Sequence, residues 1–204
     1  AHTEWMASFF KTIKEESIGL VIHDWGGMIG VAGAMRAGKK IDGLVIMNTS
    51  VTAPKDGFTP TWFHSFSQLP LISDLLFRVF NFPLSVLKRF EGIPGSYSNE
   101  DLKIYKYPLR KFKDNVGPLA LARMVPNNIE HPSVPIEKEV EEFLKSYKGS
   151  AEIVWGVNDP IMWKLRRRTE RLLPQAKTFK TDAGHFVQQE SPEKVVESIK
   201  KVFK

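Results

Sequence analysis

The stretch VIHDWGGMIG, residues 21–30, decides the fold. An apolar run leads into Asp24, and a glycine pair and a small, apolar segment follow it. An apolar strand, a turn bearing a potential nucleophile, then glycine and a helix describe a nucleophile elbow, which lifts the side chain above the sheet. The N-terminus of the following helix would stabilise negative charge there. Because Asp is also a favoured helix N-cap, this stretch alone leaves a nucleophile and a cap both open.

Four apolar runs predict a parallel sheet: residues 18–22, 43–50, 151–156 and 176–184. The first run is short and bounded by turn signals, which suits a strand buried on both faces. Helices are predicted at 3–16, around 161–173 and at 191–203. The first of these has a face expected to be buried, made of Trp5, Met6, Phe9, Phe10 and Ile13. Strands that alternate with helices predict an α/β fold with a parallel sheet.

Residues 51–132 break this alternation. They hold most of the prolines, many phenylalanines and short helical pieces such as LISDLLFRVF and SVLKRF. Ser98 followed by Asp101 predicts a variant capping box at a helix start. The segment is too long for a plain loop, so we expect a helical cap inserted into the fold. The predicted organisation is therefore a first core part at 1–50, a cap at 51–132 and a second core part at 133–204.

Composition narrows the class of protein. The 204 residues are 42% hydrophobic and 25% charged, with a net charge of +6 and no cysteine. Disulfides and cysteine-based metal sites are therefore excluded. Basic residues are scattered and not interleaved with aromatic ones, which disfavours nucleic-acid binding. There is neither an apolar run long enough for a membrane span nor a signal-peptide pattern, so we expect a cytoplasmic protein with no membrane partner.

Two further loops carry candidate catalytic residues. Asp159 follows the third predicted strand within IVWGVNDPIM, and His185 follows the fourth within TDAGHFVQQESP. Alone, each has an ordinary structural interpretation, because Asn-Asp-Pro is a common turn and a lone histidine is more often structural. Together with Asp24 they lie in the chain order nucleophile, acid, histidine, each at the carboxyl end of a strand. That is the order of the α/β-hydrolase triad.

These motifs, with LVIMNTS at 44–50 and the cap stretches YKYPLRKF and HPS, resemble the α/β-hydrolase superfamily and specifically haloalkane dehalogenases. The resemblance runs along essentially the whole chain. It implies an α/β-hydrolase fold with an inserted helical cap, and it assigns Asp24 as nucleophile, His185 as base and Asp159 as the acid that orients His185. In some relatives the acid follows the preceding strand, but here that place reads Asn48-Thr49-Ser50 and has no carboxylate.

The resemblance also implies the reaction. Asp24 would displace halide from an alkyl carbon to form an ester, and His185 would activate the water that hydrolyses it. The partners would be a small haloalkane, water and halide ion, with no cofactor and no metal. The indole N–H of Trp25 would hold the departing halide. One branch of the family uses a second tryptophan after Gly-Phe-Thr, and KDGFTPTW offers Trp62, which is at least as readily an ordinary aromatic of the cap.

The chain departs from the family at its start. Family members carry several strands and a His-Gly motif before the nucleophile strand, so we expect a fragment that lacks the N-terminal strands. Such a remnant would expose a sheet edge, which predicts self-association. Ile22 is also bulkier than the small residue usual two positions before an elbow nucleophile.

Two alternative functions remain open. The first is epoxide hydrolysis with the same Asp-His-Asp set, which would need cap tyrosines as acids, and only Tyr105 and Tyr107 lie in a plausible position. The second is a truncated, inactive hydrolase-like protein that acts as a binding module. An esterase that uses serine is disfavoured because Asp24 occupies the nucleophile position.

Overall fold

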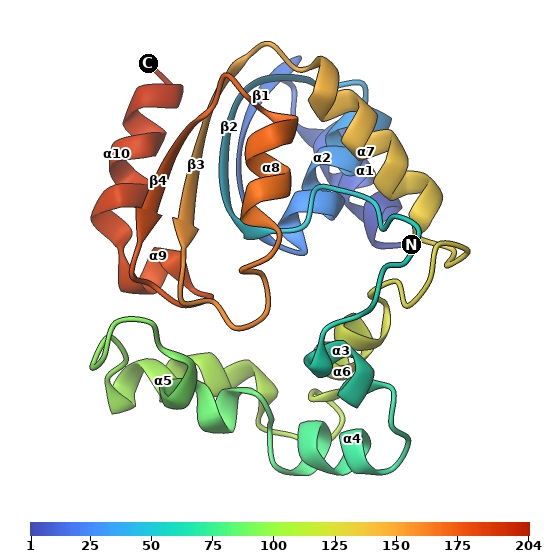
Figure 1. The fold of residues 1–204 in the computed structure, drawn as a ribbon, viewed down its shortest axis with the longest axis vertical. Coiled ribbons are helices and arrows are strands. Elements are labelled where there is room, and N and C mark those ends of the chain that lie inside the picture. Colours follow the sequence, from blue (N-terminus) through green and yellow to red (C-terminus); the bar gives the residue numbers. More distant parts are fainter.

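The computed structural model describes residues 1–204, and its centre is a four-stranded parallel sheet (Figure 1). The strands lie in chain order across the sheet, and each adjacent pair is parallel. Their bounds are β1 Ser17–Asp24, β2 Lys40–Thr49, β3 Ser150–Gly156 and β4 Lys177–Thr181. The α/β class and the four predicted strands are therefore confirmed, and the first two strands are longer than predicted.

Helices lie on both faces of the sheet (Figure 1). On one face, apolar side chains of α1, α2, α7 and α8 join those of the strands in the main hydrophobic core. On the other, α10 packs on β2 and β3 through Val195 and Val202. None of the helices has the length and apolar character needed to cross a membrane. The bounds are α1 His2–Thr12, α2 Gly26–Arg36, α7 Val134–Ser146, α8 Arg166–Leu172, α9 Val187–Glu190 and α10 Pro192–Val202.

The prediction that the first strand is buried on both faces is wrong. Leu20 and Ile22 are buried in the main core, but Val21 on the opposite face is 44% exposed. The reason is topological: β1 pairs only with β2, and the helix on that face, α10, contacts β2 and β3. An exposed sheet edge is thus present at β1, and self-association through it stays a prediction.

Two helices also differ from their predicted form. α1 ends at Thr12, and Trp5 and Phe9, both expected in its buried face, are 66% and 56% exposed. The helix expected at 161–173 begins only at Arg166. It starts late because the carboxylate of Asp159 accepts hydrogen bonds from the backbone amides of Ile161 and Met162, which holds the preceding residues in turns.

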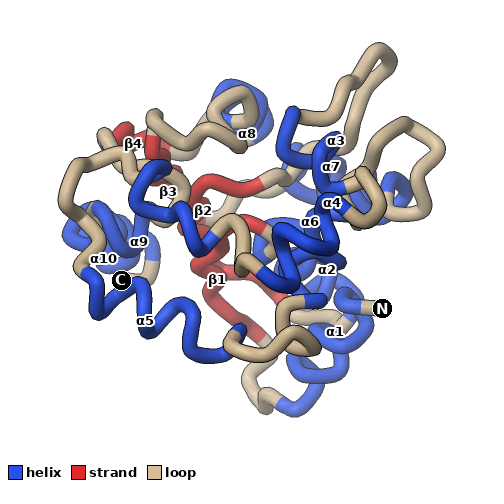
Figure 2. Tube along the Cα trace, turned by 90° about the horizontal axis from the view of Figure 1, so that it is seen from below, coloured by secondary structure: helices blue, strands red, loops and turns tan.

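Residues 51–132 contain no strand and lie beyond the carboxyl ends of the strands (Figures 1 and 2). The predicted capping box of Ser98 and Asp101 is confirmed at the start of α5. Phe77, Leu119 and Ala122 form a small separate core with neighbouring phenylalanines. The division into core and cap stays a prediction. The helices are α3 Trp62–Ser67, α4 Ile72–Asp74, α5 Asn99–Lys106 and α6 Val116–Arg123, with a π-helical segment Leu75–Val79 and 3₁₀ segments Leu84–Phe90 and Tyr107–Leu109.

Glu137, in the first turn of α7, is expected to make stability depend on pH. Its side chain has no hydrogen-bond partner, the residue is 7% exposed, and burial raises its pKa from 4.5 to about 7. The folded state therefore binds this proton more tightly than the unfolded state. The contribution of Glu137 to stability is therefore fully present below pH 4.5 and is lost as pH rises through about 7, where the carboxyl group becomes charged while still buried.

The variant Glu137→Gln removes that charge. At pH 8 we expect the free energy of unfolding to rise by about 1–3 kcal/mol, and at pH 4 to change little. Urea unfolding at the two pH values measures both. The matched control is Glu139→Gln on the same helix, where the side chain is 56% exposed and unfolding should be unchanged. An equal gain at both pH values would contradict the charge-based explanation.

Candidate active site

Asp24 lies at the carboxyl end of β1 in a strained backbone conformation. Its φ is +50°, a left-handed value that few non-glycine residues adopt. Trp25 follows as the N-cap of α2, so the strand turns into the helix within one residue. Ile22 is buried in the main core and contacts α2, where a Cβ on Gly30 would lie at ordinary contact distance, 3.5 Å, from its Cγ2 atom. The turn has the strained geometry that a nucleophile elbow requires.

The start of α2 packs very closely on the end of β2. A Cβ atom on Gly27 would lie 2.1 Å from Oγ1 of Thr49, so only glycine fits there. The hydroxyl of Thr49 in turn donates a hydrogen bond to the backbone carbonyl of Asp24. The glycine after the elbow thus permits the contact by which the neighbouring strand fixes the backbone of Asp24.

The structure brings Asp24, His185 and Asp159 together at this edge of the sheet. Nδ1 of His185 lies 2.8 Å from Oδ2 of Asp159, and Nε2 lies 3.9 Å from Oδ1 of Asp24. The first distance is a hydrogen bond and the second is too long for one. The side chain of Asp24 is 38% exposed, that of His185 is 14% exposed and that of Asp159 is fully buried. Exposure thus falls from Asp24 to Asp159.

Asp159 is held as a carboxylate by four hydrogen bonds. Oδ2 accepts from His185 and from Nδ2 of Asn48 at 2.7 Å, and Oδ1 accepts from the amides of Ile161 and Met162. Burial acts to raise the pKa of Asp159, but the hydrogen bond and charge of His185 and the bonds from Asn48 and Met162 outweigh it, so the pKa lies below its usual value. An ionised Asp159 keeps the proton of neutral His185 on Nδ1 and leaves Nε2 free to act as a base.

His185 has a raised pKa. Burial alone would lower it, but the hydrogen bond and negative charge of Asp159 outweigh burial, and Asp24 and Glu190 add to the increase. The imidazolium form is therefore stabilised, which is what a base needs while it carries a proton.

The sequence interpretation missed three residues of this site. Asn48 was noted only for lacking a carboxylate, yet its side chain joins Asp159 to the backbone of Gly156 on β3. His23 donates from Nε2 to the carbonyl of His185 at 2.8 Å, with the two rings 4.7 Å apart. The third, half-buried His64, binds Thr61 through Nδ1 at 2.7 Å. For His23, the only signal in the sequence is its position next to Asp24.

The two predicted halide-binding tryptophans are placed differently. Trp25 is half-buried next to Asp24, and its indole N–H makes no hydrogen bond within the protein. Trp62, at the start of α3, is 54% exposed, and its aromatic neighbour is Phe63 rather than a triad residue. His64, from the same helix as Trp62, interacts electrostatically with Asp24. Burial lowers the pKa of His64, and the charge of Asp24 partly opposes that. Both tryptophans stay predictions.

The cap tyrosines are also unlike one another. Tyr105 is half-buried with its ring 5.4 Å from that of Phe186, next to the base. Tyr107 is 63% exposed, with the guanidinium of Arg110 stacked 3.9 Å from its ring centre. Only one of the two tyrosines that an epoxide hydrolase would need therefore lies near His185.

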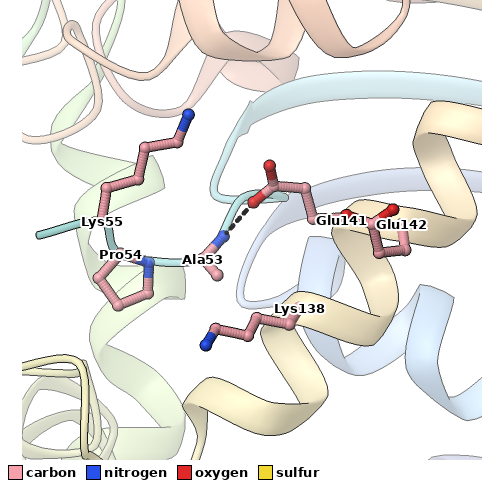
Figure 3. A pocket seen from close by; sticks show the side chains of 6 residues that line it. All are labelled: Ala53, Pro54, Lys55, Lys138, Glu141 and Glu142. Atoms are coloured by element: carbon pink, nitrogen blue, oxygen red, sulfur yellow. Dashed lines mark hydrogen bonds between the residues drawn. The ribbon is translucent and has the colours of Figure 1, made fainter.

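The surface cavity in Figure 3, about 330 Å³, lies at the root of the cap and is separate from the triad. Lys55 and Lys138 line it, and Oε2 of Glu141 on α7 accepts a hydrogen bond from the amide of Ala53 at 2.9 Å. That bond anchors the chain where it enters the cap. No group of three or more His, Asp or Glu side chains is gathered closely enough to hold a metal ion.

Sequence comparison relates the chain to known haloalkane dehalogenases. No protein-family profile matches the chain. Haloalkane dehalogenase 1 of Mycobacterium tuberculosis (strain H37Rv) is 26% identical over 201 residues, which cover 96% of this chain and 64% of that protein. A cis-3-alkyl-4-alkyloxetan-2-one decarboxylase of Shewanella oneidensis is 25% identical over 190 residues, covering 91% of this chain and 59% of that protein. The chain thus spans about two thirds or less of the length of these relatives.

Solved structures agree on the fold. The haloalkane dehalogenase DatA from Agrobacterium tumefaciens C58 superposes with a TM-score of 0.80 at 18% identity, covering 98% of this chain and 70% of that one. DbeA from Bradyrhizobium elkanii USDA94 gives a TM-score of 0.77 at 17% identity. The chain therefore has the α/β-hydrolase fold of these proteins and resembles haloalkane dehalogenases in sequence along nearly all its length.

Proposed function

We propose that this chain carries the catalytic centre of a haloalkane dehalogenase, a hydrolase that converts a small haloalkane and water to an alcohol and halide. The observation that carries the proposal is the contact series from Asp24 on its strained elbow to His185 and then to buried Asp159. The sequence resemblance to haloalkane dehalogenases supports it. The cytoplasmic location expected from the sequence stays a prediction.

In the first step, an oxygen of the Asp24 carboxylate attacks the carbon that bears the halogen. The new C–O bond forms as the carbon–halogen bond breaks, and halide leaves with the bonding electron pair. The exposed carboxylate of Asp24 suits attack on a small substrate from solvent. We assign the indole N–H of half-buried Trp25, next to Asp24 in the chain, as the donor that stabilises the developing halide charge, and Trp62 as a second donor from the cap.

In the second step, water attacks the carbonyl carbon of the ester and Nε2 of His185 takes its proton. The intermediate then collapses, the alkyl oxygen leaves as alcohol with the proton from the imidazolium, and Asp24 is left as a carboxylic acid. Release of its proton, the second one of the water, to solvent restores the carboxylate. The alcohol oxygen therefore comes from Asp24, and the water oxygen enters the carboxylate. The negative charge of Asp159 stabilises the imidazolium meanwhile.

Two other reactions could use the same residues. Epoxide opening needs acids to protonate an alkoxide, and the exposure of Tyr107 leaves Tyr105 as the single candidate near the base. The oxetan-2-one decarboxylase relative matches over 91% of this chain, against 96% for the dehalogenase. Both observations favour the dehalogenase. An inactive binding module remains the alternative in which none of these reactions occurs.

The test offers the chain 1-bromobutane, a terminal epoxide and a cis-3,4-dialkyl-oxetan-2-one in separate assays, with Asp24→Ala as the blank. We expect bromide release above the blank, and little diol or carbon dioxide. Diol or carbon dioxide without bromide would move the proposal to that reaction. If no product exceeds the blank, the chain is not an enzyme for these substrates and the dehalogenase proposal fails.

A further inference from the structure

Glu190, on α9, is a buried carboxylate that the proposed reaction does not use. The residue is 8% exposed. Its Oε2 atom accepts hydrogen bonds from the backbone amides of Gly92 and Ile93, each at 2.8 Å. Its Oε1 atom accepts from the amide of Gly184 at 3.1 Å and from the hydroxyl of Tyr97 at 3.4 Å. Three of the four donors belong to residues 51–132, and the fourth immediately precedes His185.

The two segments that Glu190 joins touch through their backbones. A Cβ atom on Gly92 would lie 2.2 Å from the amide nitrogen of Gly184, and one on Gly184 would lie 2.6 Å from the carbonyl oxygen of Phe90. No side chain separates the cap from the loop that carries His185. Residues 90–93 therefore cannot move without displacing the backbone of Gly184, because no flexible side chain lies between them.

His185 is held on its other side by the nucleophile strand. His23, the residue before Asp24, donates to the carbonyl of His185. The backbone of His185 is thus fixed at its carbonyl by β1 and, one residue earlier, at the amide of Gly184 by Glu190. Of these two supports, only Glu190 also binds the cap.

We propose that Glu190 is a positioning residue that couples the cap to the base: its contacts with Gly92 and Ile93 hold the loop of His185 in the orientation needed for ester hydrolysis. The part concerning catalysis rests on the proposed function. The coupling acts on the second chemical step, because His185 takes a proton only there. Alkylation of Asp24 needs the carboxylate and the halide donors and is independent of the loop.

The variant Glu190→Gln tests this sharply. A glutamine keeps the size of the side chain, but its amide nitrogen cannot accept hydrogen bonds, so one of the two pairs of donors loses its acceptor. We expect ester hydrolysis to slow by about 10- to 100-fold, because small displacements of a catalytic group carry penalties of this order. The rate of the first bromide release should stay within about threefold. Rapid-quench measurement of bromide and alcohol in a single turnover separates the two rates.

A second readout is independent of activity. Hydrogen exchange in Glu190→Gln should accelerate at the amide of Gly184 together with those of Gly92 and Ile93, and the pKa of His185 followed by NMR should fall, since the charge of Glu190 now helps to raise it. The matched control is Glu141→Gln, which removes a carboxylate charge from the side chain that binds Ala53 at the cap root but has no contact with residue 184. It should change neither Gly184 exchange nor the His185 titration.

Each result of these experiments either supports or overturns the coupling of the cap to His185 through Glu190. Unchanged Gly184 exchange and an unchanged His185 titration in Glu190→Gln would overturn the coupling, as would equal slowing of both chemical steps. If Glu190→Gln does not fold, Tyr97→Phe removes one hydroxyl donor and keeps the charge of Glu190. Faster exchange at Gly184 and slower ester hydrolysis are then expected at smaller size, and no change in either would count against the proposal. If the unaltered chain releases no bromide, the proposed function fails, while exchange and titration still decide the coupling.

Discussion

Replacement of His185 by phenylalanine is expected to stop the reaction after one bromide per chain and to leave an alkyl ester on Asp24. Displacement of halide uses only the carboxylate of Asp24, whereas hydrolysis of the ester needs a base on the water. The neighbouring His23 does not replace it, because Nε2 of His23 is already engaged by the carbonyl of residue 185. Intact-protein mass spectrometry after incubation with 1-bromobutane should find one added butyl group, and peptide mapping should place it on Asp24.

The control for this experiment is His131→Phe, a histidine whose Nδ1 accepts a backbone amide at 3.2 Å outside the site. It should turn over many equivalents of bromide and carry no ester. An unmodified His185→Phe chain that still released one equivalent of bromide, or one with continued turnover, would contradict the two-step mechanism.

Substitution of Asp159 by asparagine is expected to slow ester hydrolysis by about 10³- to 10⁴-fold, the size of effect seen when the orienting acid of a catalytic triad loses its charge. A neutral amide no longer stabilises the imidazolium, and its NH₂ group can donate to Nδ1 and so select the wrong tautomer of His185. Asn48 would then also meet an amide in place of the carboxylate oxygen that it now binds at 2.7 Å. Single-turnover alcohol formation measures the loss.

The pH dependence supplies a second check on Asp159. His185 must be neutral to accept the proton, so the acidic limb of the rate profile follows its pKa, which the charge of Asp159 raises. In Asp159→Asn that limb should shift to lower pH. Asp182→Asn, an exposed carboxylate three residues before His185 in the same loop, is the control and should leave the profile unchanged. A shift to higher pH in Asp159→Asn would refute the assigned role.

Much of the fold follows from local patterns in the sequence. The four strands and the capping box at Ser98 are set by short runs of residues, and these predictions are confirmed. The exposure of Val21 and Trp5 was not predictable in the same way. A residue pattern indicates which side chains favour burial, but which faces are covered depends on the strand order and on the reach of a helix as distant in sequence as α10.

The residues of the candidate site also fall into two groups, those that local sequence patterns predict and those that they do not. Asp24, Asp159 and His185 could be proposed because each follows a predicted strand in a recognised order. Asn48 and Glu190 could not, because their roles rest on partners far away in the chain: Asn48 binds Asp159 over 111 positions, and Glu190 binds Gly92 over 98. An asparagine near the end of a strand and a glutamate at the end of a short helix have many ordinary uses, and only the folded chain specifies these roles.

The hydrogen bond between Asn48 and Asp159 has an evolutionary consequence. Asn48 lies near the end of β2 and Asp159 in the loop that follows the neighbouring strand β3, with Nδ2 and Oδ2 2.7 Å apart. Two single substitutions, Asn48→Asp and then Asp159→Asn, would transfer the acid from one strand to the next. In the intermediate, two adjacent carboxyl groups would share one proton, since like charges so close do not both ionise. A lineage could therefore relocate its acid without ever passing through an ancestor that lacked one.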